Sequence, residues 1–142
     1  FLCTGGIGLD IYSEALQQQG KSIDDGKAVL GCWAIIAEDP EAEAARIGDH
    51  VLYQINEYIK WGAFGPPDQT PLFEDLSSAI ENGLYELWDA DTAVAELSKL
   101  VQDYPMISDI HFWAQFPGES VESGSARMQY IAEKVLPRLR QP

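Results

Sequence analysis

Basic residues are scarce in this sequence. Its 142 residues include nine lysines and arginines against 23 aspartates and glutamates, which gives a formal net charge of −14. A surface of this sign repels the phosphates of nucleic acids and of anionic lipids. We therefore expect no nucleic-acid partner and no membrane partner, and we interpret acidic pairs such as Asp24-Asp25, Glu41/Glu43 and Glu74-Asp75 as a solvated surface.

The sequence also lacks a long apolar run. No stretch of about 20 apolar residues occurs, as a membrane-spanning helix would require. The segment Phe1 to Gly6 is short and apolar and ends in glycines, without the basic start and the longer apolar stretch of a secretory signal. We therefore expect a cytoplasmic protein.

Cysteine and histidine are equally rare, with two residues of each kind. Cys3 and Cys32 lie in apolar runs without a C-x-x-C spacing, which predicts buried free thiols rather than a disulfide or a metal site. His50 and His111 belong to no HExxH or comparable grouping, so we predict no metal ion.

What the chain does have is enough apolar sequence, 46% of its residues, to build the core of one domain over residues 1–142. Apolar residues at helical spacing predict helices over 9–19, 40–60, 72–82, 89–102 and 121–136, the last closed by Pro137. The clearest start is Asp39-Pro40, where a capping side chain precedes a proline at the first helical position. Apolar or β-rich runs predict strands over 1–6, 28–37 and 110–116.

Alternation of strands and helices predicts an α/β fold with parallel strands and covering helices. The sheet is either open and doubly wound or part of a (β/α)8 barrel. A closed barrel needs about 250 residues, so this chain could supply only its last portion.

Two segments are candidates for a binding site. Gly5-Gly6-Ile7-Gly8 suggests a dinucleotide turn, but Ile11 occupies the place of the third glycine, so a plain strand-to-helix turn is favoured. In the last strand, alternation places Ile110, Phe112, Ala114 and Phe116 on one face and His111, Trp113 and Gln115 on the other. No catalytic triad, phosphate-binding loop or acid dyad occurs, so the catalytic residues stay unknown.

Four segments in a fixed order resemble one known family. They are AEDPE at 37–41, WDADTA at 88–93, HFWAQFPG at 111–118 and AEKVLPR at 132–138. With these segments the chain resembles the luciferase-like flavin-dependent monooxygenases, and the likeness covers nearly its whole length.

The resemblance implies that the chain is the carboxyl-terminal portion of a TIM-like barrel, holding strands six to eight. It also implies FMN or a deazaflavin as cofactor of the parent protein and a small organic substrate. Since five strands and most cofactor contacts would lie elsewhere, we expect no cofactor bound to this chain alone and no activity of it alone. The positions that would lie at the ligand-binding rim are Thr4, Gly5, Gly6, Glu38, Gln115 and Phe116.

An alternative of another class stays open at this point. A chain with only three strands could be a noncatalytic α/β binding or assembly module, whose unpaired strand edges pair in a homodimer or another self-association.

Overall fold

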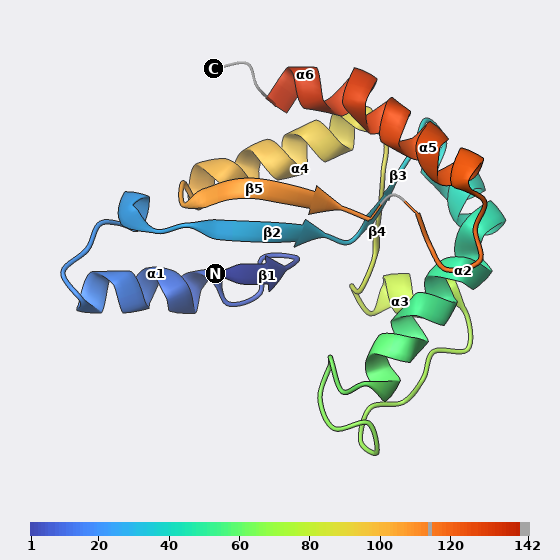
Figure 1. Ribbon diagram of the computed structural model, residues 1–142, viewed down its shortest axis with the longest axis horizontal. Helices are drawn as coiled ribbons and strands as arrows, with labels where there is room; N and C mark the ends of the chain where they lie inside the picture. Colours follow the sequence, from blue (N-terminus) through green and yellow to red (C-terminus); the bar gives the residue numbers. More distant parts are fainter. Residues whose placement is uncertain (114, 140–142) are drawn as a thin grey trace.

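Short parallel strands in two sheets organise the chain, as seen in a computed structural model that describes residues 1–113 and 115–139 (Figure 1). Within these residues, one sheet has the strand order β1 (Leu2–Thr4), β2 (Ala28–Cys32) and β5 (Ile107–Phe112). The other sheet pairs β3 (Ala34–Ile36) with β4 (Glu86–Trp88). The fold is therefore α/β with parallel strands, as predicted.

Helices connect these strands or follow the last of them. They are α1 (Leu9–Gln18), α2 (Pro40–Lys60), α3 (Leu76–Glu81), α4 (Ala90–Asp103), α5 (Val121–Tyr130) and α6 (Leu136–Leu139), with a 3-10 turn at Ile23–Asp25 and a π-helical turn at Ile131–Val135. Figure 1 shows the three-stranded sheet with α1 on one side of the molecule, and α2 with α3 on the other. No helix in the described part of the chain is both long enough and apolar enough to cross a bilayer.

The run 28–37 is apolar and buried as predicted, but the prediction of one continuous strand is wrong. Pairing changes at Trp33: β2 pairs with β1 and β5, whereas β3 pairs with β4. The partner strand β4 escaped prediction because its three residues, Glu86 to Trp88, form neither an apolar run nor an alternating pattern. An apolar run shows that a segment is buried, but it does not show at which residue the segment changes its partner strand.

Element ends also differ from the prediction. The helix predicted over 72–82 begins only at Leu76, because the side chain of Asp75 caps it by accepting from the Ser78 amide at 2.8 Å. The last strand ends at Phe112 and not at Phe116. Pro137 does not close the final helix, since helical structure continues through it, from the π-helical turn at Ile131–Val135 into α6 as far as Leu139.

Two apolar cores stabilise the fold. One lies around the three-stranded sheet and contains the buried residues Cys3, Leu9, Ala28, Leu30, Cys32, Ala34, Ile36, Ala93, Leu97, Met106, Ile107, Ile131 and Val135. The other lies around α2, whose Ile47, Val51, Ile55 and Ile59 recur every fourth residue and are almost fully buried. Each such side chain contributes about 1.5–3 kcal/mol when buried, so α2 is held mainly by this stripe. Both cysteines are buried and free, as predicted.

Candidate functional site

Two tryptophans meet at the carboxyl ends of neighbouring strands. Cys32 of β2 and Phe112 of β5 are partners in the parallel register, so the residues that follow them, Trp33 and Trp113, leave the sheet side by side. Their ring centroids lie 6.4 Å apart, with the rings nearly perpendicular at 85°. The carboxyl end of a parallel sheet is where α/β proteins commonly bind ligands.

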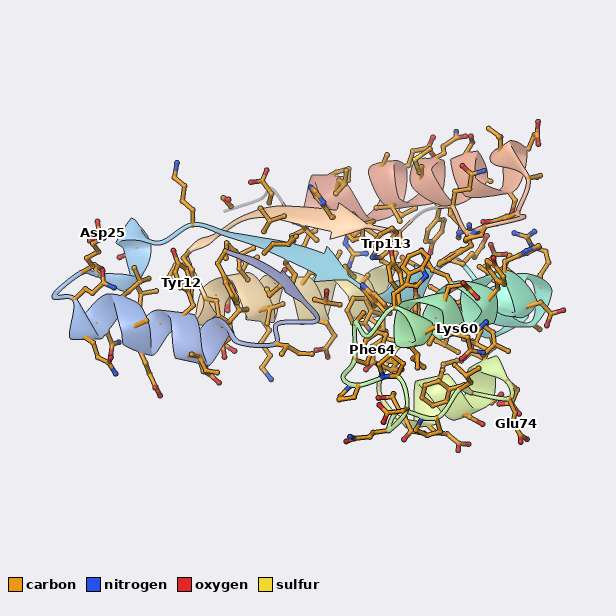
Figure 2. All side chains as sticks on the ribbon, turned by 60° about the horizontal axis from the view of Figure 1, so that its bottom comes forward. Tyr12, Asp25, Lys60, Phe64, Glu74 and Trp113 are labelled. Atoms are coloured by element: carbon orange, nitrogen blue, oxygen red, sulfur yellow. The ribbon has the colours of Figure 1, made fainter. Side chains whose placement is uncertain are left out.

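Trp33 is the centre of a larger group of rings. Its centroid lies 5.7 Å from that of Tyr58, 5.5 Å from that of Phe64 and 5.3 Å from that of Tyr85. We call Trp33, Tyr58, Phe64, Tyr85 and Trp113 the strand-end aromatic cluster. In Figure 2, Trp113 lies near the end of β2, and Phe64 lies beside α2. Such ring pairs contribute about 0.5–1.5 kcal/mol each beyond their buried area.

The cluster runs from the core to the surface. Tyr85 is 1% exposed, whereas Trp113 is 37% exposed. The Tyr85 hydroxyl donates to Oε1 of Gln54 at 3.4 Å, and burial raises the pKa of this phenol far above its ordinary value. Tyr85 is therefore a neutral hydrogen-bond donor and not an acid or base, and the cluster offers flat apolar contact rather than proton transfer.

A buried charge network lies next to the cluster. Arg127 of α5 is 5% exposed and donates through Nη1 to Glu43 Oε1 at 2.6 Å and to Glu119 Oε1 at 2.5 Å. Its Nη2 donates to the second oxygen of Glu119, and Ser123 donates to the first. Arg46 adds a bidentate contact to Glu43, at 2.9 Å from Nε and 2.7 Å from Nη2. We call Glu43, Arg46, Glu119, Ser123 and Arg127 the ion network.

The ion network fixes the connection between β5 and α5. Burial opposes ionisation of Glu119, but the hydrogen bonds from Arg127, Ser123 and the Phe116 amide outweigh it and hold the pKa of this carboxyl below its usual range. The pKa of Glu43 is also lowered, because contacts with Arg46 and Arg127 overcome its burial. The guanidinium carbon of Arg127 also lies 5.4 Å from the centroid of the Phe116 ring.

Sequence reasoning missed this network. The sequence predicts an ordinary surface charge at Glu43, but its side chain is only 15% exposed and it pairs with an arginine 84 positions away. The pairing cannot be read from sequence spacing, because it joins α2 to α5 across the fold.

Of the predicted rim residues, Thr4, Gly5 and Gly6 lie at the end of β1. Thr4 is the last residue of this strand, and Gly5 and Gly6 form the turn that follows, with φ of 57° and 81°. The Gly5 amide donates to the Gly31 carbonyl at 2.9 Å. Glu38 is exposed and lies between β3 and α2. Since β1 and β3 belong to different sheets, these positions do not follow neighbouring strands.

Gln115 and Phe116 lie beyond the end of β5, so the strand alternation predicted for them does not apply. Gln115 is exposed, and its Nε2 donates to the Glu119 carbonyl at 3.4 Å. Phe116 is 2% exposed and packs in the α2 core, with its ring centroid 6.1 Å from that of Tyr85. Ala114, predicted on the same face as Phe116, lies outside the described residues.

Two hollows lie near the aromatic cluster. The larger, about 410 Å³, is apolar and is bounded by Ile110, Phe112, Met128, Ile131 and Leu136, so it separates β5 from the last helices. The exposed His111 also lines it. The smaller hollow, about 110 Å³, lies along α2 between Tyr53 and Pro117.

The chemistry of the predicted rim does not fit a flavin phosphate. Its side chains offer a hydroxyl at Thr4, a carboxylate at Glu38 and an amide at Gln115, and none of them is cationic. An anion beside Glu38 would be repelled. Within residues 1–113 and 115–139 there is also no group of three or more histidine, cysteine, aspartate or glutamate side chains that could hold a metal ion.

Comparison of the chain with the models of known protein families found no match, and no curated protein matches it.

Proposed function

We propose that this chain supplies the last three β/α units of a luciferase-like (β/α)8 barrel. In the proposed parent protein, a flavin-dependent monooxygenase, the strand-end aromatic cluster forms one wall of the site for a small organic substrate. The cofactor, FMN or a deazaflavin, would be held mainly by the rest of the barrel, because the rim of this chain offers no cation for its phosphate. The chain alone is then inactive.

The observation that carries this proposal is the Trp33 and Trp113 pair. The two rings follow adjacent parallel strands and lie 6.4 Å apart, and Trp113 keeps 37% of its surface exposed. An apolar organic substrate gains binding energy from flat aromatic walls, while a flavin supplies the redox chemistry. The proposed role of the cluster is to position the substrate and to exclude water.

The strand order supports a larger barrel. β1, β2 and β5 are parallel and are neighbours within their sheet, with α1 between β1 and β2, and α2, α3, α4 and the two strands of the other sheet between β2 and β5. Among the described residues, β1 and β5 each pair with a strand on one side only. Unpaired edges and exposed apolar residues such as Leu2, which is 71% exposed, would be covered by further strands.

A flavin titration tests whether the cofactor site lies mainly outside this chain. The purified chain is titrated into FMN and, separately, into a deazaflavin while flavin fluorescence is recorded. We expect no saturable quenching. Stoichiometric tight binding would show that this chain holds a complete cofactor site and would overturn the assignment of that site to other strands.

Complementation tests the barrel itself. The chain is co-expressed with a segment that carries the first five β/α units of a luciferase-like monooxygenase, and we expect the two to co-purify and to bind flavin. In this complex, Trp113→Ala should raise the KM for substrate by up to about tenfold and leave flavin binding unchanged. The control is Tyr12→Leu, which alters an aromatic residue on the opposite side of the molecule (Figure 2).

The unpaired strand edges equally favour a second candidate, a noncatalytic module that self-associates through β1 and β5. The net charge of −14 on each copy opposes such an assembly at low salt. Sedimentation at several protein and salt concentrations distinguishes the two candidates, because a monomer that stays monomeric at high salt contradicts edge pairing between copies.

A further inference from the structure

The smaller hollow has the chemistry of a cation site. It is lined by Tyr53, Gln54, Glu57, Tyr58, Trp61 and Pro117, and we call it the α2 groove. The first five of these residues come from the carboxyl-terminal half of α2 and the residue that follows it, and Pro117 comes from the connection between β5 and α5.

Two walls of the groove are rings set at a right angle. The centroids of Tyr58 and Trp61 lie 5.6 Å apart, with an interplanar angle of 90°. Tyr53 lies on the same side of α2 as Glu57 and Trp61, at helical spacings of four residues. Tyr53 is 56% exposed and Trp61 is 72% exposed, so core packing does not account for these rings.

Glu57 brings a negative charge to the groove. The Glu57 side chain is 25% exposed and its Oε1 lies 2.7 Å from Nζ of Lys60, whose own side chain is 52% exposed. Solvent around the half-exposed lysine weakens this pair, so the carboxylate can also attract a second cation. The charge of the whole chain, −14, also attracts cations to this surface.

The position of Pro117 is fixed. His50 Nδ1 lies 3.0 Å from the Pro117 carbonyl oxygen, so the imidazole donates to it. The ion network holds the same connection through Glu119 and the Phe116 amide, at 3.1 Å. The groove is therefore bounded by anchored elements on both sides and does not depend on a loose loop.

We propose that the α2 groove binds the quaternary ammonium group of a small organic cation. Aromatic rings attract such a cation through their negative faces, and a neighbouring carboxylate adds to the attraction. A volume of about 110 Å³ is too small for a complete drug-sized ligand, which occupies about 300 Å³ or more, but it suits a head group. This inference does not rest on the proposed function, because every residue of the groove belongs to this chain.

The test is a calorimetric or NMR titration of the intact chain with choline, and in parallel with 3,3-dimethylbutan-1-ol, which has the same shape without the charge. We expect saturable binding of choline and binding of the neutral alcohol that is about fivefold weaker or more. Equal affinity for the two compounds, or no saturable binding of choline, would overturn the proposal.

Variants locate the site. Trp61→Leu should weaken choline binding about fivefold or more and, because Trp61 is largely exposed, leave the circular dichroism spectrum unchanged. Glu57→Gln should weaken binding, whereas Glu96→Gln, the same charge change on the exposed surface of α4, should not. If the two glutamine variants weaken binding equally, choline is attracted only by the net charge of the chain, and the proposed site in the α2 groove is wrong.

A substitution of Lys60 should strengthen choline binding. Lys60→Met removes the cation that pairs with Glu57, so choline should bind more tightly than to the unchanged chain. Weaker binding to this variant would contradict the role given to the carboxylate.

Discussion

Arg127 and Glu119 form a buried ion pair between α5 and the connection that precedes it. Arg127 Nη1 lies 2.5 Å from Glu119 Oε1, and the side chains are 5% and 2% exposed. The same guanidinium reaches Glu43 on α2 at 2.6 Å. Arg127 therefore connects α5 to α2. It also holds Glu119 in place, in the connection between β5 and α5.

Arg127→Met should destabilise the fold by about 3–5 kcal/mol, because it leaves the buried carboxylate of Glu119 without its main partner and takes from Glu43 one of its two arginine partners. Urea unfolding followed by circular dichroism measures the loss. The control is Arg138→Met, which removes an exposed pair with Asp91 and should change stability by about 1 kcal/mol or less. Equal losses in the two variants would contradict a stabilising role of the ion network.

Acid should weaken this network. The pKa values of Glu43 and Glu119 are lower in the folded state than in the unfolded chain, since contacts with arginine outweigh burial. Their contribution is therefore fully present above about pH 4.3, the ordinary glutamate value, and is lost as the pH falls through the lowered values.

Urea unfolding across pH 3 to 7 measures this loss. Protonation of surface carboxylates relieves repulsion and acts in the opposite direction, so Arg127→Met serves as the reference. In that variant the two carboxyl pKa values return toward the ordinary range, and the acid-induced loss of stability should be smaller. An unchanged pH dependence would rule out the network as its source.

The two tryptophans at the strand ends should differ in their structural role. Trp33 contacts three further rings besides Trp113, so Trp33→Ala should destabilise the fold by about 3–5 kcal/mol. Trp113→Ala removes a partly exposed ring and should cost about 1 kcal/mol. Near-ultraviolet circular dichroism and urea unfolding test both, and a large loss from Trp113→Ala would assign this ring to the core rather than to a binding surface.

The thiols should be unreactive in the folded chain. Burial raises the pKa of Cys32 to about 12, and burial also raises the pKa of Cys3. Since the thiolate is the reacting species, a chromogenic disulfide reagent at pH 8 should label neither cysteine rapidly without denaturant and both in urea. The Cys3→Ser variant identifies which thiol reacts, and fast labelling of Cys32 in the native chain would contradict its burial.

Local features of the chain were predictable from the sequence. Asp39-Pro40 predicts the start of α2, and the side chain of Asp39 indeed accepts from the Ala42 amide at 2.9 Å. The repeat of apolar residues gives α2 its buried stripe, and the apolar runs give buried strands. These features depend on contacts within one turn or on the period of one element, so the information lies in neighbouring residues.

The candidate site depended on the tertiary structure. Trp33 and Trp113 become neighbours only because β2 and β5 pair in a register that connects positions 80 apart. The ion network joins α2 to α5 in the same way, and the change of partner at Trp33 depends on the short strand β4.

The sequence by itself thus determined the α/β class, the buried free cysteines and the acidic surface, because composition and short-range periodicity encode them. The tertiary structure decided the division into two parallel sheets, the aromatic cluster and the α2 groove. The two sheets and the cluster are meetings of distant residues whose free energy depends on register and packing. The groove draws five residues from α2 and the position that follows it, and only the tertiary structure adds Pro117 from the distant connection between β5 and α5.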